Sequence, residues 1–193
     1  MKENIRNSCS IAVQAITGFF RNEYNVARIV QASELVAACF KNGNKVVICG
    51  NGGSACDAMH FAEEFTGRFR KDRKALPVIS LTDSSHITCV GNDYGFEEIF
   101  ARGVEAYGKS GDILVGISTS GNSENVIKAI DKAKKLGMQV ISLLGKDGGK
   151  LAGIADLEFI VNAETTDRIQ EVHMTVLHLV IEGVERLLFP NNY

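Results

Sequence analysis

The sequence has little of several features that mark whole classes of protein. Tryptophan is absent, prolines number 2, and the 5 cysteines form no C-x-x-C pair; they are Cys9, Cys39, Cys49, Cys56 and Cys89. Their odd number and scattered positions argue against a disulfide framework and against a zinc site made of thiolates. We therefore expect a protein of the reducing cytoplasm.

An excess of charge of one sign is also missing. The chain carries 21 Lys and Arg against 23 Asp and Glu, a net charge of −2, which offers no electrostatic argument for nucleic acid or an anionic membrane as the main partner. No apolar run approaches membrane-spanning length, and residues 1–6 lack the apolar core of a signal peptide. We expect no nucleic acid and no membrane among the partners.

Five short apolar segments have the length of β-strands. Most are near-continuous apolar runs, as is typical of strands that are covered on both faces. Helical patterns separate them, and this alternation predicts an α/β fold with a parallel, doubly wound sheet and right-handed crossovers. The predicted strands are 45–50, 76–81, 112–118, 139–145 and 157–161, and the helices between them are 54–69, 96–107 and 122–136.

Two more helices are expected before the first strand, at 3–21 and 25–41, and a last one at 167–188. The last carries apolar residues around much of its circumference, and helices of this kind on a small domain usually bury a second face against another subunit. We predict a single domain over residues 1–193, in which the helices of 1–42 serve oligomerisation and 43–193 form the core and the C-terminal helix.

The turn after the third predicted strand concentrates groups that hold phosphate. Four hydroxyls fall within six positions, on Ser118, Thr119, Ser120 and Ser123. The turn leads into a helix, whose N-terminus offers free N–H donors and the positive end of its dipole to an anion. Asn122 or Ser123 alone could cap this helix. Four hydroxyls exceed what one cap needs, so the pattern favours a phosphate site.

A second group of residues has the spacing of a metal site. His60 and Glu64 are four residues apart on one predicted helix, so both lie on the same face. On the last helix, Gln170 and His178 are eight residues apart, about 80° around the axis. Two imidazoles, a carboxylate and an amide oxygen are a plausible ligand set for Zn²⁺ or a similar divalent ion.

Simpler explanations of these residues stay open at this point. A His–Glu pair at this spacing is often only a solvated helix pair, and Asp167-x-x-Gln170 could be a capping box. His173 lies on another face of the last helix, so we expect it to pack or to be at the surface. His86 is expected at the start of a short helix.

The first glycine-rich turn satisfies a dinucleotide-binding pattern only in part. Gly50-Asn51-Gly52-Gly53-Ser54-Ala55 matches G-x-G-x-x-A between a strand and a helix. That fold also wants an acidic residue at the end of the next strand, about 20 positions on. The nearest candidate, Asp83, lies past that strand, which disfavours a dinucleotide site.

Taken together, five motifs resemble the phosphoheptose isomerase family of the sugar-isomerase (SIS) fold, in family order and over essentially the whole chain. They are Gly50-Asn51-Gly52-Gly53-Ser54, His60-Phe61-Ala62-Glu63-Glu64, Gly91-Asn92-Asp93-Tyr94-Gly95-Phe96, Ser118-Thr119-Ser120-Gly121-Asn122-Ser123 and Arg168-Ile169-Gln170-Glu171-Val172-His173. The resemblance implies a three-layer αβα sandwich of flavodoxin or Rossmann type around a five-stranded parallel sheet. It also implies a homotetramer with active sites between subunits, one zinc ion per subunit, and a role in making the ADP-heptose of the lipopolysaccharide inner core.

The resemblance also implies roles for individual residues. The zinc ligands fall on His60, Glu64, Gln170 and His178. The phosphate contacts fall on Ser118, Thr119, Ser120 and Ser123. The sugar contacts fall on Asn51, Gly52, Gly53, Glu64, Asn92, Asp93 and Gln170, and a further active-site aspartate falls on Asp167. One departure is Leu144, where such enzymes often have Thr; it lies outside these contacts.

The implied reaction converts sedoheptulose 7-phosphate to D-glycero-D-manno-heptose 7-phosphate through a cis-enediol. Glu64 is the candidate base and His178 the candidate acid, with zinc polarising the carbonyl. Because a carboxylate on Zn²⁺ is a poorer base, either Glu64 leaves the metal during turnover or the metal only organises the site.

An alternative comes from the same fold. A non-catalytic relative binds the replication initiator DnaA, and this chain resembles it even near the C-terminal Leu188-Phe189-Pro190. That relative lacks the carboxylate at the position of Glu64 and the imidazole at the position of His178. Both are present in this chain, which favours the enzyme over a binding protein.

Overall fold

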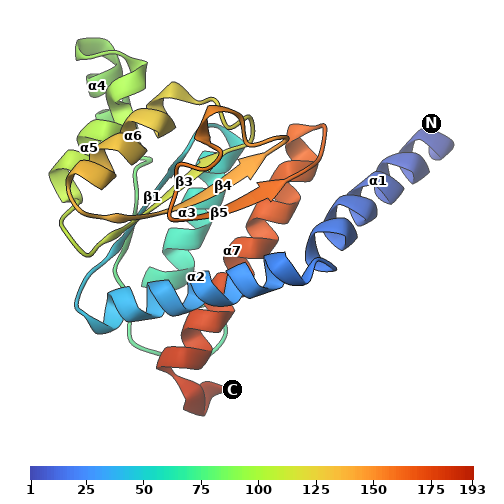
Figure 1. Ribbon diagram of the computed structural model, residues 1–193, viewed down its shortest axis with the longest axis horizontal. Coiled ribbons are helices and arrows are strands. Elements are labelled where there is room, and N and C mark those ends of the chain that lie inside the picture. Colours follow the sequence, from blue (N-terminus) through green and yellow to red (C-terminus); the bar gives the residue numbers. More distant parts are fainter.

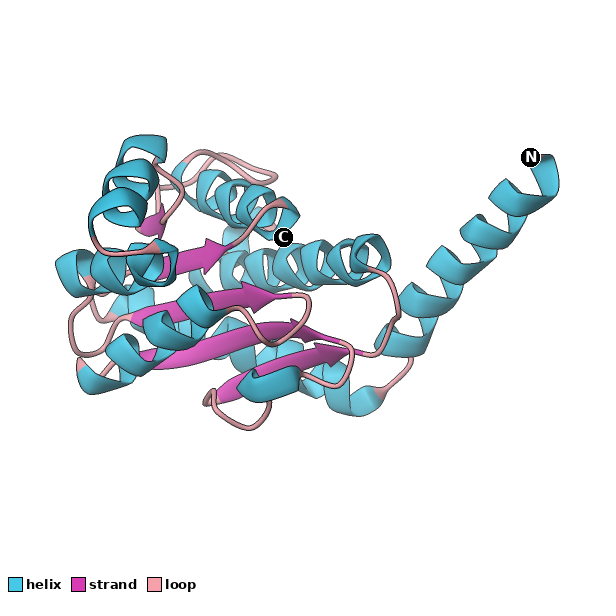
Figure 2. Ribbon diagram, turned by 90° about the horizontal axis from the view of Figure 1, so that it is seen from above, coloured by secondary structure: helices cyan, strands magenta, loops and turns pink.

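A parallel sheet lies at the centre of the fold, between layers of helices (Figure 2). Its five strands have the order β2-β1-β3-β4-β5. The computed structural model describes residues 1–193. The strands are β1 (Val46–Gly50), β2 (Val78–Ser80), β3 (Ile113–Ser118), β4 (Gln139–Gly145) and β5 (Leu157–Val161). The predicted parallel sheet is therefore confirmed. β2 is shorter than the predicted 76–81, since only Val78–Ser80 pairs with β1 and Pro77 before it has no N–H to donate.

Helices cover both faces of the sheet (Figure 1), which confirms the three-layer sandwich. One face carries α2 (Glu23–Lys41), α3 (Gly53–Thr66) and α7 (Thr166–Leu188), and the other carries α4 (Ser84–Asp93), the 3₁₀ turn η1 (Phe96–Glu98), α5 (Ile99–Tyr107) and α6 (Glu124–Lys135). Successive strand residues point to opposite faces. Val46 and Ile48 accordingly pack into the core under α2, α3 and α7, and Val47 and Cys49 into the core under α5 and α6.

Two helix boundaries differ from the sequence prediction, each for a local reason. α3 ends at Thr66 rather than at residue 69, because Gly67 follows and its backbone leaves the helical region. The predicted helix 96–107 is divided into η1 and α5. The short helix expected at His86 is confirmed as α4, which Asp83 caps by accepting a hydrogen bond from the His86 amide at 2.8 Å.

The first helix, α1 (Lys2–Phe20), leaves the domain as a projecting arm (Figure 1). Only Phe19 near its end is buried, and its apolar side chains at Ile5, Ile11, Val13 and Ile16 are exposed. α2 begins after Asn22, whose side chain accepts a hydrogen bond from the Tyr24 amide at 3.0 Å. No helix combines the length and hydropathy that a membrane span requires.

The strand order places a reversal between β1 and β3. These strands are neighbours in the sheet, but the helices that follow them, α3 and α6, pack on opposite faces. In doubly wound sheets, ligands bind in the crevice outside the carboxyl ends of the strands at such a point. Both predicted phosphate- and sugar-binding turns begin there, one after β1 and the other after β3.

Candidate active site

The Ser118–Ser123 turn joins β3 to α6 and is held by its own hydroxyls. Ser118 ends the strand and is buried, and its Oγ lies 2.9 Å from the Oγ of Ser123. Ser123 occupies the N-cap position of α6, but its side chain makes no capping hydrogen bond. The first N–H groups of α6 are therefore left without a side-chain partner, as an anion site at a helix N-terminus requires.

The shape of this turn depends on Gly121. Its φ is +64°, and a Cβ there would overlap the carbonyl of Gly148 in the loop after β4. The two loops are also joined by a hydrogen bond from the Lys150 amide to Asn122 Oδ1 at 3.1 Å. Contacts with the loop after β4 thus fix the conformation of the Ser118–Ser123 turn, which we call the phosphate turn, without a ligand.

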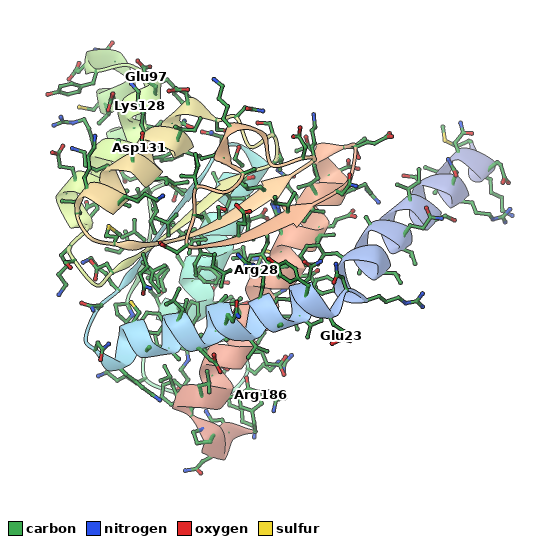
Figure 3. The ribbon with its side chains drawn as sticks, viewed as in Figure 1. Glu23, Arg28, Glu97, Lys128, Asp131 and Arg186 are labelled. Carbon is green, nitrogen blue, oxygen red and sulfur yellow. The ribbon has the colours of Figure 1, made fainter.

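A pocket of about 560 Å³ opens beside the turn; it is lined by Asn51, Phe96, Glu97, Ser123, Glu124, Asn125 and Lys128. Lys128 is held at its wall by Glu98 at 2.7 Å and Glu97 at 3.7 Å, and Figure 3 shows Glu97 and Lys128 close together at this corner of the molecule. The hydrogen bond to Glu98 raises the pKa of Lys128. The uncharged polar side chains that line this pocket are Asn51 after β1, Ser123 after β3 and Asn125 in the first turn of α6.

The candidate metal ligands His60, Glu64 and His178 come together between α3 and α7. One ligand atom of each lies within 4.8 Å of the others. His60 Nε2 lies 3.3 Å from Glu64 Oε1, and the rings of His60 and His178 are 5.0 Å apart. These side chains are not a solvated surface pair, since Glu64 is largely buried and His178 belongs to a different helix.

His178 packs against Phe69 and is partly buried. The two rings stack with centroids 5.8 Å apart. Partial burial, followed by the neighbouring His60, lowers the pKa of His178. The neutral imidazole is therefore favoured near neutral pH, and this form can bind a metal through one ring nitrogen and donate the N–H of the other.

Gln170, the fourth predicted ligand, lies further towards the N-terminus of α7. Its side-chain amide rests on the backbone of Gly53, where a Cβ would come within 2.5 Å of Nε2. Gln170 and Gly53 were both predicted to contact the sugar, and the fold brings these two together. Gly53 begins α3, the helix that carries His60 and Glu64, and Gln170 precedes His178 on α7.

Arg73 holds the end of α3 that carries Glu64. Its guanidinium is buried and donates to the carbonyls of Glu64 and Phe65, the latter at 2.7 Å, in the last turn of the helix. Its Nε donates to Glu185 of α7 at 2.7 Å, and Glu185 in turn accepts from the Tyr193 hydroxyl at 2.8 Å. The last carbonyls of α3 are thereby satisfied, and the cluster's two helices are joined by a buried ion pair.

The remaining predicted sugar contacts lie elsewhere in the chain. Asn92 and Asp93 end α4 on the opposite face of the sheet from α3 and α7, and both are exposed. Asp167 is exposed at the start of α7 and lines a pocket of about 570 Å³ against α1. Hydrogen bonds from Thr165 and then Arg168 lower the pKa of Asp167 to about 2. Within one chain, none of these three carboxylate or amide groups joins the cluster of His60, Glu64 and His178.

His173 has a structural place, as the sequence predicted. It is fully buried, and its Nε2 lies 2.9 Å from the carbonyl oxygen of Leu144, which pairs with Ser118 across the sheet. Burial lowers the pKa of His173 to about 4, against an ordinary 6.5. The neutral ring donates to Leu144 and so ties α7 to the strand beside the phosphate turn.

Three residues with a place in this site escaped the sequence analysis: Asn125, Arg73 and Phe69. Asn125 makes two hydrogen bonds to Asn51. Its signal in the sequence is an amide among the core-facing residues of α6, next to Val126 and Ala129. Arg73 and Phe69 lie in the loop between α3 and β2, where no periodicity marks a contact.

Comparison with known proteins gives a consistent result. A family profile described as "SIS domain" matches residues 12–145. The phosphoheptose isomerase of Fusobacterium nucleatum is 57% identical over 190 residues, 98% of each chain, and that of Escherichia coli is 55% identical over 183 residues, 94% of this chain and 95% of the relative. The solved structure of phosphoheptose isomerase from Neisseria gonorrhoeae has a TM-score of 0.89 at 41% identity, covering 95% of this chain and 98% of that one.

Proposed function

The chain belongs to the SIS domain family and, within it, to the phosphoheptose isomerases, and we propose that it converts sedoheptulose 7-phosphate to D-glycero-D-manno-heptose 7-phosphate. The observation that carries this proposal is the presence, in one fold, of an anion-binding turn and a carboxylate–imidazole cluster. Identities of 55% and 57% to isomerases over nearly the whole chain favour catalysis over the DnaA-binding alternative.

The phosphate is held at the start of α6. The hydroxyls of Ser118, Thr119, Ser120 and Ser123 and the first amides of the helix donate to its oxygens. Binding at this distant group orients C1 and C2 of the sugar, and this orientation lowers the barrier to reaction. Asn51, Gly52, Gly53 and Gln170 line the path from the phosphate towards the cluster.

Glu64 and His178 move the protons. Glu64 takes a proton from C1 of the ketose while His178 donates one to the C2 oxygen, which leaves a double bond between C1 and C2 with a hydroxyl on each carbon. The O1 proton then returns to His178 as the carbonyl forms at C1, and Glu64 delivers its proton to C2. The products are an aldose and the starting forms of both residues. Arg73 supports this step by holding the last turn of α3, on which Glu64 lies.

The cluster suits a zinc ion. Two imidazole nitrogens and a carboxylate oxygen within 4.8 Å of one another match the donors that Zn²⁺ prefers. His60, Glu64 and His178 would hold it, with Gln170 as the fourth ligand. A bound zinc ion supplies polarisation of the sugar's oxygen atoms.

We also propose that the active unit is a homotetramer of single-domain chains in the cytoplasm, contributing to the heptose of lipopolysaccharide. Exposed apolar side chains on α1, and an apolar groove between α2 and α7 lined by residues such as Val26, Val30 and Leu179, support assembly. The cluster of one chain is not reached by its own Asn92, Asp93 or Asp167. These residues would join an active site that is shared with a neighbouring subunit.

The direct test is an assay for heptose phosphate formation with metal analysis of the same preparation. We expect turnover by the purified protein, about one zinc per chain by mass spectrometry, and loss of turnover with a chelator that Zn²⁺ restores. Full turnover in protein freed of metal would refute the zinc proposal. A DnaA pull-down tests the alternative: DnaA binding by a protein without turnover would refute the isomerase.

Assembly is tested by Ile16→Glu, which places a charge on the exposed apolar face of α1. We expect a smaller species by light scattering together with lower activity. If Ile16 packs only within its own domain, the variant loses stability without forming a defined smaller species. A stable and fully active wild-type monomer would contradict the proposal.

A further inference from the structure

Asn125 lies on the side of α6 that otherwise packs into the core. It is 3% exposed, and its neighbours Val126 and Ala129 are fully buried. A buried side-chain amide is costly unless its donors and acceptor are hydrogen-bonded. Its partners therefore explain why an asparagine occupies this position.

Asn51 supplies both partners. Asn51 Nδ2 donates to Asn125 Oδ1 at 2.8 Å, and Asn125 Nδ2 donates to Asn51 Oδ1 at 2.9 Å. This reciprocal pair fixes the plane and the orientation of the Asn51 amide. Each amide has a second N–H that the pair does not use, and Asn51 lines the pocket beside Ser123. The pair therefore holds Asn51 ready to donate to a ligand in that pocket.

The pair also crosses the point where the strand order reverses. Asn51 follows β1, Asn125 is the second residue of α6 after β3, and 74 positions separate them in the chain. The helices after these strands, α3 and α6, lie on opposite faces of the sheet and cannot hold the two turns together by packing on each other. Backbone pairing of β1 with β3 ends at Gly50 and Ile117, and the Asn51–Asn125 pair continues the connection past that point.

We propose that Asn125 is a positioning residue for the isomerisation. It holds Asn51, and with it the sugar-contacting turn after β1, at a set distance from the phosphate turn. The phosphate end and the sugar end of the substrate are thus gripped by one rigid unit. This inference rests on the proposed function, because Asn125 acts on the same substrate through Asn51 and does not contact it.

The test is a double-mutant cycle on Asn51 and Asn125. Asn125→Leu keeps the branched shape of the side chain and removes both hydrogen bonds, and Asn125→Ala replaces it if the leucine variant does not fold. We expect kcat/KM to fall about 10-fold, because a loosened contact loses orientation. The double variant with Asn51→Ala should be no worse than Asn51→Ala alone. Asn125→Asp, which keeps the acceptor for Asn51, should recover part of the loss.

Affinity for inorganic phosphate separates positioning from a general structural role. It should stay within about 2-fold of wild type in the Asn125 variants, since the Ser118–Ser123 turn is intact. Asp131→Ala, exposed on the same helix (Figure 3), is the matched control and should leave kcat/KM unchanged.

Three results would overturn the inference while the proposed function stands. They are unchanged kcat/KM in a folded Asn125 variant, additive losses in the double variant, and a loss of phosphate affinity that matches the loss of kcat/KM. A wild type with no heptose phosphate turnover is a different outcome. It overturns the proposed function, and the inference falls with it.

Discussion

The Ser118–Ser123 turn lies at the carboxyl edge of the sheet, whereas His60, Glu64 and His178 lie between two helices. Ser118 is 2% exposed and the turn is fixed by Gly121, Asn122 and the loop after β4. The His60 side chain, by contrast, is 43% exposed. The proposed phosphate end is therefore held by contacts within one chain, whereas the cluster end is partly open to solvent.

This difference follows from what each end has to do. A phosphate is the same in substrate and product, so donors that hold it can be fixed in advance. In the proposed reaction, the cluster has to admit a sugar, exchange protons and bind a metal. Buried contacts support its two helices: Arg73 bonds to the last turn of α3, and His173 of α7 bonds to Leu144 of β4. Four changes test whether the two ends are as separable as this contrast suggests.

The largest effect is expected from Glu64→Gln. The amide keeps the size and an oxygen ligand but cannot take a proton from carbon, so kcat should fall by roughly 10²-fold or more. Affinity for inorganic phosphate should not change, because the phosphate turn is untouched. Glu63→Gln is the matched control: Glu63 is adjacent and exposed, and its variant should keep wild-type turnover. Near-normal turnover in Glu64→Gln would eliminate Glu64 as the base.

The next largest effect is expected from Glu185→Gln, which tests the buried ion pair between Arg73 and Glu185 that supports the helices of the cluster. This change leaves the buried Arg73 guanidinium without its counter-charge, and breaking a buried ion pair costs about 3–5 kcal/mol. Glu182→Gln on the same helix breaks only pairs with the exposed Arg70 and Arg186, worth about 0–1 kcal/mol. Urea unfolding measures both. Equal losses in the two variants would show that the Arg73 pair has no special weight.

The buried His173 should make the free energy of unfolding depend on pH. Its pKa is lowered to about 4 in the folded chain, against about 6.5 when unfolded. The unfolded chain therefore binds the proton more readily, and stability falls as the pH drops from about 6.5 to about 4. The loss in free energy of unfolding approaches roughly 3 kcal/mol.

The comparison variant is His173→Gln, whose Nε2 can still donate to Leu144 but does not titrate. It should lose less stability than wild type between pH 7 and pH 4.5 when thermal unfolding is followed. Parallel pH curves for the two proteins would mean that His173 is not the group responsible.

The sequence predicts the sheet and the helices of this protein better than the long-range side-chain contacts that connect them. The parallel sheet, the layers and the phosphate turn follow from apolar runs, turn residues and their order, which are local patterns. Helical spacing also places His60 and Glu64 on one face of α3, and Gln170 and His178 on one side of α7. Asn125 and Arg73 could not be found in this way, because their partners lie far along the chain, 74 positions from Asn125 and 112 from Arg73. Such contacts depend on the packing of elements, which no local pattern records.

The smallest effect, expected from Ser123→Ala, decides between two roles for the phosphate turn. Ser123 stands at the N-cap of α6, but its hydroxyl lies against Ser118 and caps nothing. Removing this hydroxyl should lower the affinity for inorganic phosphate about 10-fold, because one hydrogen bond to a charged group is lost. The thermal midpoint should hardly move. Asn22→Ala removes a working cap on α2 and should show the reverse, a loss of about 1 kcal/mol with unchanged phosphate affinity. If Ser123→Ala instead lowers stability and leaves phosphate binding intact, Ser123 serves the helix, and the contrast between a phosphate end and a cluster end fails.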